Sequence, residues 1–210
     1  LHDTIEDTYA TYETIKGEFG DEVADLVDGV TKISVLENTA SPNSKAENFR
    51  KLILATSKDI RVLLVKIADR LHNMRTIKAI TKEDKRKRIA QETMEIYAPL
   101  ADRMGMHRIR DELEDLSFEI LNNDARSLIQ KRLDEIKLDK KDIFENLSSE
   151  FDKLLNENNI KTEIYGRVKT SLSIWRKKKK KRVSLEQITD IIGFRITVKN
   201  IDDCYKTLGL

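Results

Sequence analysis

Length, composition and charge limit the classes of protein to which this chain can belong. The 210 residues include 36% charged and 6% aromatic side chains, with only two prolines and seven glycines, which predicts a soluble, mainly helical protein. The single cysteine, Cys204, excludes an internal disulfide framework and favours the cytoplasm. No apolar run approaches the roughly 18 residues of a membrane span, and a net charge of +2 predicts no nucleic-acid partner.

The first eight residues, Leu-His-Asp-Thr-Ile-Glu-Asp-Thr, concentrate ligand chemistry. In a helix, His2 and Glu6 would share one face, and Asp3 and Asp7 the adjacent one. Three carboxylates placed so close together repel one another unless a cation lies among them. The pattern therefore indicates a metal site. The alternative is an acidic helix N-terminus, stabilised by the helix dipole, with a solvated histidine.

Apolar spacing predicts helices through most of the first 60 residues. One opening helix is expected through Ile5, Tyr9, Tyr12 and Ile15, and it stops at Gly17 and Gly20. A second helix is expected from Asp21 to about Ile33. A loop over Asn38 to Lys45 follows, and then a helix from Ala46 that carries Phe49, Leu52 and Ile53.

The segment from Ile60 to Met74 is nearly all apolar and predicts a helix that is buried on most sides. Asp69 lies in its middle. A buried carboxylate is costly unless it is paired, protonated or bound to a cation. The simplest alternative to a binding site is an ordinary ion pair between Asp69 and Arg70 or Arg75.

Two further polar residues follow Asp69 at helical spacing. Asn73 and Thr76 lie four and seven residues further on, within about 40° of Asp69 around a helix. The same segment contains His72, for which packing near the site is favoured over direct ligation. These residues indicate a second polar patch that can complete the site of the first eight residues.

The rest of the chain changes from helical to mixed α/β character near an Asn-rich turn at 156–159. Dense alternating charge predicts that the helices just before this turn are solvated connectors. The expected elements are helices over Lys82–Arg103 (kinked or ended at Pro99), His107–Leu121, Ala125–Ile136 and Lys140–Asn156, then a strand over Thr162–Tyr165, a helix over Thr170–Lys177, a strand over Ile191–Val198 and a helix over Ile201–Leu208.

Seven consecutive basic residues run from Arg176 to Arg182. Such a run predicts a solvated or disordered segment, and a polyanion site is the second interpretation. Only Trp175 adjoins it, so the aromatic interleaving typical of single-stranded nucleic-acid binding is missing.

Several motifs together resemble the long RelA/SpoT proteins, the bifunctional enzymes that make and degrade the guanosine polyphosphates (p)ppGpp. The hydrolase half of that family is similar to His-Asp-Thr-Ile-Glu-Asp at 2–7, Val-Asp-Gly-Val-Thr-Lys at 27–32 and Ile-Ala-Asp-Arg-Leu-His-Asn-Met-Arg-Thr at 67–76. The match continues in the same order with Tyr-Ala-Pro-Leu-Ala-Asp-Arg-Met-Gly-Met at 97–106, Gly-Arg-Val-Lys at 166–169, Ser-Ile-Trp-Arg-Lys at 173–177 and Asp-Ile-Ile-Gly-Phe-Arg at 190–195.

For the first half, the resemblance implies an HD-type helical hydrolase that removes the 3′-pyrophosphate of (p)ppGpp to leave GDP or GTP. By resemblance, manganese is held by His2, Asp3 and Asp69, the attacking water is positioned by Glu6 and Asp7, and the nucleotide is contacted by Asn73 and Thr76. A mixed nitrogen and oxygen ligand set suits Mn²⁺, which polarises phosphoryl oxygens.

For the last part, the resemblance implies the beginning of a synthetase that transfers pyrophosphate from ATP to the 3′-hydroxyl of GDP or GTP. The ATP-contacting positions are matched by Arg167, Lys169, Ser173 and Lys177, and the Mg²⁺-binding position by Asp190. Asp190 also comes just before an apolar strand, a suitable place for an exposed magnesium ligand, and the alternative is a turn residue at the start of that strand.

The fold class expected from the resemblance is mainly α. It comprises an HD-type domain over 1–122 that lacks its N-terminal part, a helical connector over 123–157, and the first part of a nucleotidyltransferase-like α/β synthetase domain over 158–210. The family's first metal histidine is expected before Leu1 and its synthetase glutamate after Leu210, so we expect a fragment without synthetase activity. A catalytically inactive regulatory or interaction fragment is the alternative to the hydrolase, and no oligomeric state is predicted.

Overall fold

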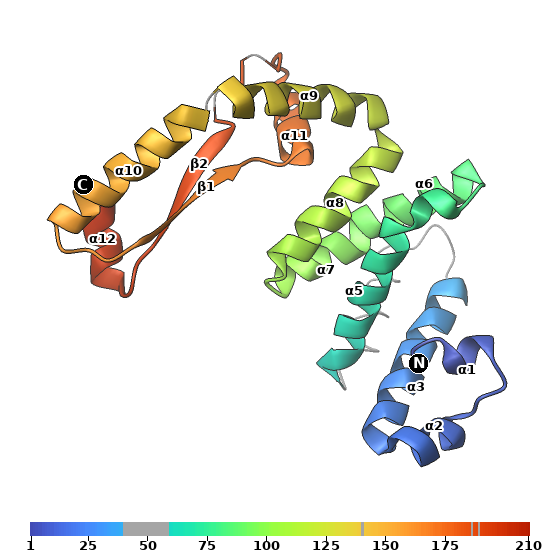
Figure 1. Ribbon diagram of the computed structural model, residues 1–210. Coiled ribbons are helices and arrows are strands. Elements are labelled where there is room, and N and C mark those ends of the chain that lie inside the picture. Colours follow the sequence, from blue (N-terminus) through green and yellow to red (C-terminus); the bar gives the residue numbers. More distant parts are fainter. Residues whose placement is uncertain (40–58, 140, 186, 189) are drawn as a thin grey trace. The chain divides into compact units, whose positions relative to one another are not determined.

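The computed structural model describes residues 1–39, 59–139, 141–185, 187–188 and 190–210 (Figure 1). The expected helix from Ala46, and the part of the expected loop beyond Thr39, lie outside these residues. The described chain forms two compact units, 1–117 and 118–210. None of its helices is long and apolar enough to cross a membrane.

The regular elements among the described residues of the first unit are all helical. Its elements are α1 (Thr4–Asp7), α2 (Tyr12–Phe19), α3 (Asp21–Thr39), α5 (Ile60–Arg75), the 3₁₀ turn η1 (Ile77–Ala79), α6 (Glu83–Glu92), the π-helical turn η2 (Thr93–Tyr97), α7 (Ala98–Arg103) and α8 (His107–Leu121), whose last turn enters the second unit.

The prediction of one continuous opening helix is wrong. The chain leaves helical geometry after Asp7 because the hydroxyl of Thr8 binds back to the Thr4 carbonyl and accepts the Ala10 amide. The side chain of Thr11 then caps the start of α2 by accepting the Thr14 amide. Short polar side chains that bond nearby backbone groups compete with helix in this way. At its other end α1 begins only at Thr4, so His2 precedes the helix and does not share a helix face with Glu6.

The ends of two helices differ from those expected. Gly17 lies within α2, and only Gly20, with φ +85°, ends that helix. This left-handed backbone conformation is one that glycine adopts without steric cost. The helix that was expected to end near Ile33 continues to Thr39.

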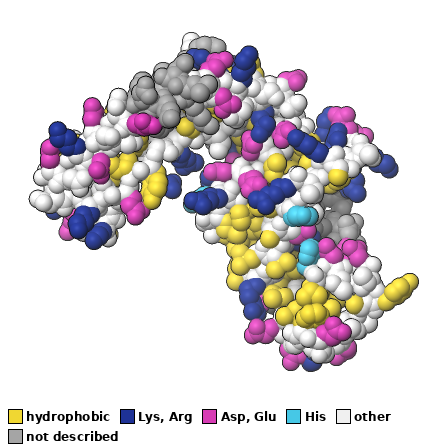
Figure 2. Space-filling model, viewed as in Figure 1, with side chains coloured by type: hydrophobic (Ala, Val, Ile, Leu, Met, Phe, Trp, Pro, Cys, Tyr) yellow, Lys and Arg dark blue, Asp and Glu magenta, His cyan; other side chains and the backbone are white. Residues whose placement is uncertain are grey.

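Close contact between α3 and α5 holds the centre of the first unit together. A Cβ built on Gly29 would lie 2.8 Å from Cγ2 of Val62, so only glycine fits at this crossing without a shift. The prediction that α5 is buried on most sides is wrong, because Ile60 is 57% and Leu64 38% exposed. Hydrophobic side chains gather on the face of the first unit seen in Figure 2.

The helix expected over Lys82–Arg103 is continuous but changes its pitch. Its middle turn, η2, is π-helical and comes just before Pro99 in the first turn of α7. Proline lacks an amide hydrogen and clashes with the carbonyl four residues before it, and a wider turn relieves that conflict.

The second unit combines helices with one antiparallel pair of strands. Beyond the end of α8 its elements are α9 (Asn123–Asp139), α10 (Lys141–Glu157), β1 (Glu163–Val168), α11 (Ser171–Lys181), β2 (Ile192–Thr197) and α12 (Ile201–Gly209). The register pairs Glu163 with Thr197 and Val168 with Ile192. These elements agree with the predicted α/β pattern.

The prediction of solvated connector helices fails for α9. Its Ile129 and Leu133 are buried in one cluster with Ile174 of α11 and with Ile188 and Ile191. Its charged residues Lys131, Arg132, Asp134 and Glu135 are exposed, whereas its buried apolar residues place the helix in the core of the second unit.

The basic run from Arg176 is ordered rather than irregular. It forms the last turns of α11, which ends at Arg182 in a left-handed conformation, φ 54°. Cations are favourable at the negative end of the helix dipole. Lys179 and Lys178 also lie over the Trp175 ring, with Nζ 4.8 and 5.8 Å from its centre.

Candidate metal centre

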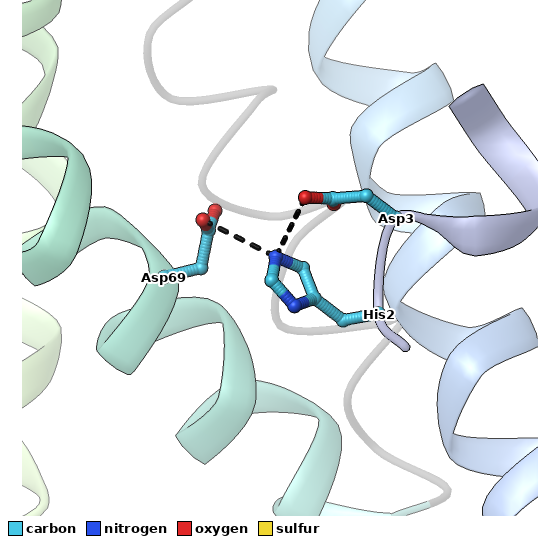
Figure 3. A group of neighbouring side chains, drawn as sticks. All are labelled: His2, Asp3 and Asp69. Carbon is cyan, nitrogen blue, oxygen red and sulfur yellow. Dashed lines mark ion pairs between the residues drawn. The ribbon is translucent and has the colours of Figure 1, made fainter.

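His2 and Asp3 lie in the turn that leads into α1. The carbonyl of Asp3 accepts the Asp7 amide at 2.8 Å and the Glu6 amide at 3.1 Å, which makes Asp3 the N-cap residue. An aspartate in this position normally caps the helix with its side chain. Here the side chain makes no capping bond, and its carboxylate faces the imidazole of His2 (Figure 3).

Asp69 projects from α5 and has a largely buried side chain that is 14% exposed. Its Oδ1 accepts a hydrogen bond from Nδ2 of Asn73 at 3.0 Å, and its Oδ2 lies 4.0 Å from Nζ of the buried Lys66. The amide of Asn73 therefore fixes the orientation of the carboxylate.

The two arginines offered as ordinary partners for Asp69 bind other carboxylates. Arg75 donates to Glu112 of α8 at 2.6 and 2.9 Å, which lowers the pKa of the Glu112 carboxyl. Arg70 donates to Glu92 of α6 at 3.0 Å and lies 4.1 Å from the ring centre of Tyr97.

His2, Asp3 and Asp69 meet at one point (Figure 3). Nε2 of His2 lies 2.9 Å from Oδ2 of Asp3 and 3.3 Å from Oδ1 of Asp69. Nevertheless, this buried nitrogen has no partner with hydrogen-bond geometry. The three ligand atoms lie within 4.8 Å of one another.

This arrangement fits a divalent cation. Two ligands on opposite sides of a cation, with bonds of about 2.1 Å, stand about 4.2 Å apart. The imidazole nitrogen lies 2.9 and 3.3 Å from the two carboxylate oxygens, within that limit, and two carboxylates offset the charge of a divalent ion. An imidazole nitrogen that is buried without a hydrogen bond, beside two carboxylate oxygens, has the donor chemistry of a first-row metal site.

The remaining predicted hydrolase residues lie outside this three-residue group. Glu6 and Asp7 are exposed on α1. Thr76 ends α5, and its hydroxyl donates to the His72 carbonyl at 3.1 Å. Sequence reasoning missed Lys66, although its place one turn before Asp69 on the same helix could have indicated it.

A second polar cluster lies in the second unit. Nζ of Lys169 lies 2.5 Å from Oδ2 of Asp190, and Nζ of Lys177 pairs with Oδ1. These two ammonium groups hold the pKa of the Asp190 carboxyl well below its usual range. The predicted Mg²⁺ ligand is thus joined to both of the lysines that were predicted to contact ATP.

The other two predicted ATP-contacting residues flank this cluster. Ser173, in the first turn of α11, donates its amide to the Thr170 side chain that caps the helix. Arg167 is exposed on β1 and is paired in register with Gly193, which offers no side chain to cover it.

Comparison with known proteins matches two parts of the chain to known families. The HD domain family matches residues 1–107, and the region found in RelA / SpoT proteins matches residues 166–210. The whole chain aligns with the GTP pyrophosphokinase rsh of Brucella melitensis at 48% identity. The chain belongs to the RelA/SpoT family.

Two further relatives of this RelA/SpoT chain have names that describe hydrolysis. Over 209 residues, the chain is 46% identical to the guanosine-3′,5′-bis(diphosphate) 3′-pyrophosphohydrolase of Haemophilus influenzae and 44% identical to the bifunctional (p)ppGpp synthase/hydrolase SpoT of Escherichia coli. The chain spans 28–31% of the length of these three relatives.

The family assignment confirms the predicted fold class, an HD domain followed by the start of a RelA/SpoT region. The match to the HD domain contains His2, Asp3 and Asp69, and the match to the RelA/SpoT region contains Lys169, Lys177 and Asp190. Each polar cluster therefore lies within one matched region. The finer division at 122 and 157 stays a prediction.

Proposed function

We propose that this chain carries a metal-dependent (p)ppGpp 3′-pyrophosphohydrolase site, which releases pyrophosphate and leaves GDP or GTP. The observation that carries the proposal is the convergence of His2, Asp3 and Asp69 around a buried imidazole nitrogen that has no hydrogen bond. The names of relatives at 44–46% identity support the choice of substrate.

In this proposal each residue has a separate task. His2, Asp3 and Asp69 hold a divalent cation, for which we propose Mn²⁺. When bound, the cation supplies Lewis-acid polarisation of a phosphoryl oxygen. Asn73 keeps the Asp69 carboxylate in place through its 3.0 Å hydrogen bond.

Proton transfer and nucleotide binding belong to residues around the cation site. We assign Glu6 or Asp7 as the general base that takes the proton of the attacking water, because both follow Asp3 within one helical turn. Thr76 and the amide of Asn73 are assigned to the nucleotide. The buried ammonium of Lys66 adds positive charge beside Asp69, which favours a polyphosphate substrate.

The second cluster belongs to the same proposal as a nucleotide site. Arg167, Lys169, Ser173 and Lys177 would bind the phosphates and base of ATP, since arginine forks to phosphate and lysine contributes a point charge. Asp190 would bind Mg²⁺ after exchanging at least one lysine partner. In the pyrophosphate transfer of the family, GDP or GTP would accept the pyrophosphate, although we expect no such transfer by the 210-residue chain itself. We propose the cytoplasm as the cellular compartment.

The test is the release of pyrophosphate from ppGpp by the 210-residue chain at saturating Mn²⁺. Asp69→Asn keeps the size of the side chain but removes its charge, and we expect it to reduce the rate at least a hundredfold. Asp84→Asn removes the same charge from the exposed first turn of α6 and should leave the rate unchanged.

Two results would decide against parts of this proposal. If the unsubstituted chain releases no pyrophosphate, the alternative of an inactive regulatory or interaction fragment replaces the hydrolase. If activity survives in the Asp69→Asn variant, the chemistry occurs elsewhere and the site assignment is wrong.

A further inference from the structure

A pocket of about 330 Å³ opens between α9 and the C-terminal end of α11. We call it the α9–α11 pocket, and its lining residues are Leu128, Lys131, Arg132, Glu135, Lys178, Ser184 and Leu185. The two helices are fixed to each other beside it, because Ser171 of α11 donates a 3.0 Å hydrogen bond to Gln130 of α9. The volume lies at the lower end of the range for small-molecule sites, roughly 300–1,000 Å³.

The charge of the α9–α11 pocket is suited to an anion. Three cationic side chains line it, from Lys131, Arg132 and Lys178, against one carboxylate, from Glu135. Arg132 and Glu135 pair at 3.0 Å, but each side chain is 47% exposed, and a surface ion pair of this kind is weak because solvent screens it. Arg132 can therefore exchange this partner for a phosphate, to which its guanidinium donates two hydrogen bonds at once.

The pocket also has an apolar side. Leu128 is 61% exposed, and Leu185 packs against the cluster formed by Ile129 and its neighbours. A ligand that fits both sides carries a flat or apolar group together with several negative charges. Ser184 adds a hydroxyl to the lining of the pocket.

The α9–α11 pocket shares no residue with the Asp190 cluster. Lys177 turns toward Asp190, whereas Lys178, the next residue, lines the pocket. Consecutive residues of a helix are about 100° apart around its axis. The basic run of α11 is thus divided between two separate sites.

We propose that the α9–α11 pocket binds a nucleoside polyphosphate, with the phosphates on Lys131, Arg132 and Lys178 and the base against Leu128 and Leu185. This site is additional to the nucleotide sites of the proposed function and does not depend on them. An extended single strand is disfavoured, because no aromatic side chain on which bases could stack is among the lining residues of the pocket.

The test is equilibrium dialysis of the 210-residue chain with labelled GTP, ATP or inorganic tripolyphosphate, in the presence of EDTA. Lys131→Glu and Lys178→Glu should each weaken nucleotide binding at least tenfold. Lys180→Glu makes the same charge change on the exposed surface of α11, outside the pocket, and should weaken binding less than threefold. Comparison of GTP with ATP identifies the preferred base.

Two further variants serve different purposes. One distinguishes the contribution of the base to binding from that of the phosphates, and the other distinguishes binding at the α9–α11 pocket from binding at the Asp190 cluster. Leu128→Asp should weaken the binding of nucleotides more than the binding of tripolyphosphate, because only nucleotides carry a base. Lys177→Ala removes a lysine of the Asp190 cluster, so nucleotide that stays bound to this variant and is lost on adding Lys131→Glu is assigned to the pocket. Lys131 and Leu128 are exposed, so their substitution should leave the far-ultraviolet circular dichroism spectrum unchanged.

Three outcomes would overturn the proposal. Equal losses for Lys178→Glu and Lys180→Glu would show general attraction to a basic surface. Retention of full affinity by Lys131→Glu would place the nucleotide elsewhere. Tighter binding of a single-stranded RNA oligonucleotide than of any mononucleotide would make the surface a nucleic-acid site.

Discussion

At the scale of single residues, the candidate metal centre consists of side chains that do not make their usual contacts. Asp3 occupies an N-cap position without capping the helix. Nε2 of His2 is buried without a hydrogen bond. A buried polar atom left in this state is costly, and a cation that binds all three ligands removes that cost.

The position of Asn73 allows two roles, which are orientation of the Asp69 carboxylate and contact with the nucleotide. If it orients Asp69, Asn73→Ala should weaken Mn²⁺ binding about tenfold or more, the usual effect of removing a group that supports a metal ligand. Thr76→Val, at the end of the same helix, should leave Mn²⁺ affinity unchanged. A rise in KM with unchanged Mn²⁺ affinity would show instead that Asn73 acts on the nucleotide alone.

The residues of this centre were predictable because their chemistry is visible in the sequence. A carboxylate in an apolar helix, as at Asp69, and a histidine beside an aspartate indicate a site before any fold is known. Their relative geometry was not predictable, because it depends on where α1 begins. This helix begins only at Thr4, after His2 and Asp3, and apolar periodicity does not locate the end of a helix to the residue.

At the scale of elements, the position of Asp69 depends on how α5 packs against α3. Gly29 and Val62 meet at this crossing, where an added Cβ would lie 2.8 Å from a methyl carbon. The glycine therefore permits a short distance between the two helices. Sequence reasoning identified both helices but had no means to identify the crossing point.

Gly29→Ala should destabilise the first unit by about 1–3 kcal/mol, the usual cost of overpacking. In a Val62→Ala background the clash is relieved, so the same change should be neutral or stabilising, because alanine is the better helix former. Urea unfolding of the four variants measures this coupling. Equal losses in both backgrounds would contradict the proposed contact.

At the scale of the whole molecule, the two units carry separate chemistry. Residues 1–117 contain the candidate metal centre, and residues 118–210 contain the Asp190 cluster and the α9–α11 pocket. The order of family motifs predicted this sequence of regions. The role of α9 was misjudged because its charged residues are more numerous than the two buried ones, Ile129 and Leu133.

Mn²⁺ should therefore protect one unit selectively from hydrogen exchange. A ligand that binds only the folded state stabilises the elements that hold it, so amides of α1 and α5 should exchange more slowly with Mn²⁺ while those of β1 and β2 are unchanged. The Asp69→Asn variant should show no such protection. Equal protection of β1 and β2 would contradict the assignment of the metal to the first unit.

The most direct test of the metal centre is the binding of Mn²⁺ itself, followed by electron paramagnetic resonance of the free ion. We predict one tightly bound Mn²⁺ per unsubstituted chain, loss of that site in His2→Ala and Asp69→Asn, and its retention in Asp84→Asn. Undiminished binding in both His2→Ala and Asp69→Asn would contradict the account.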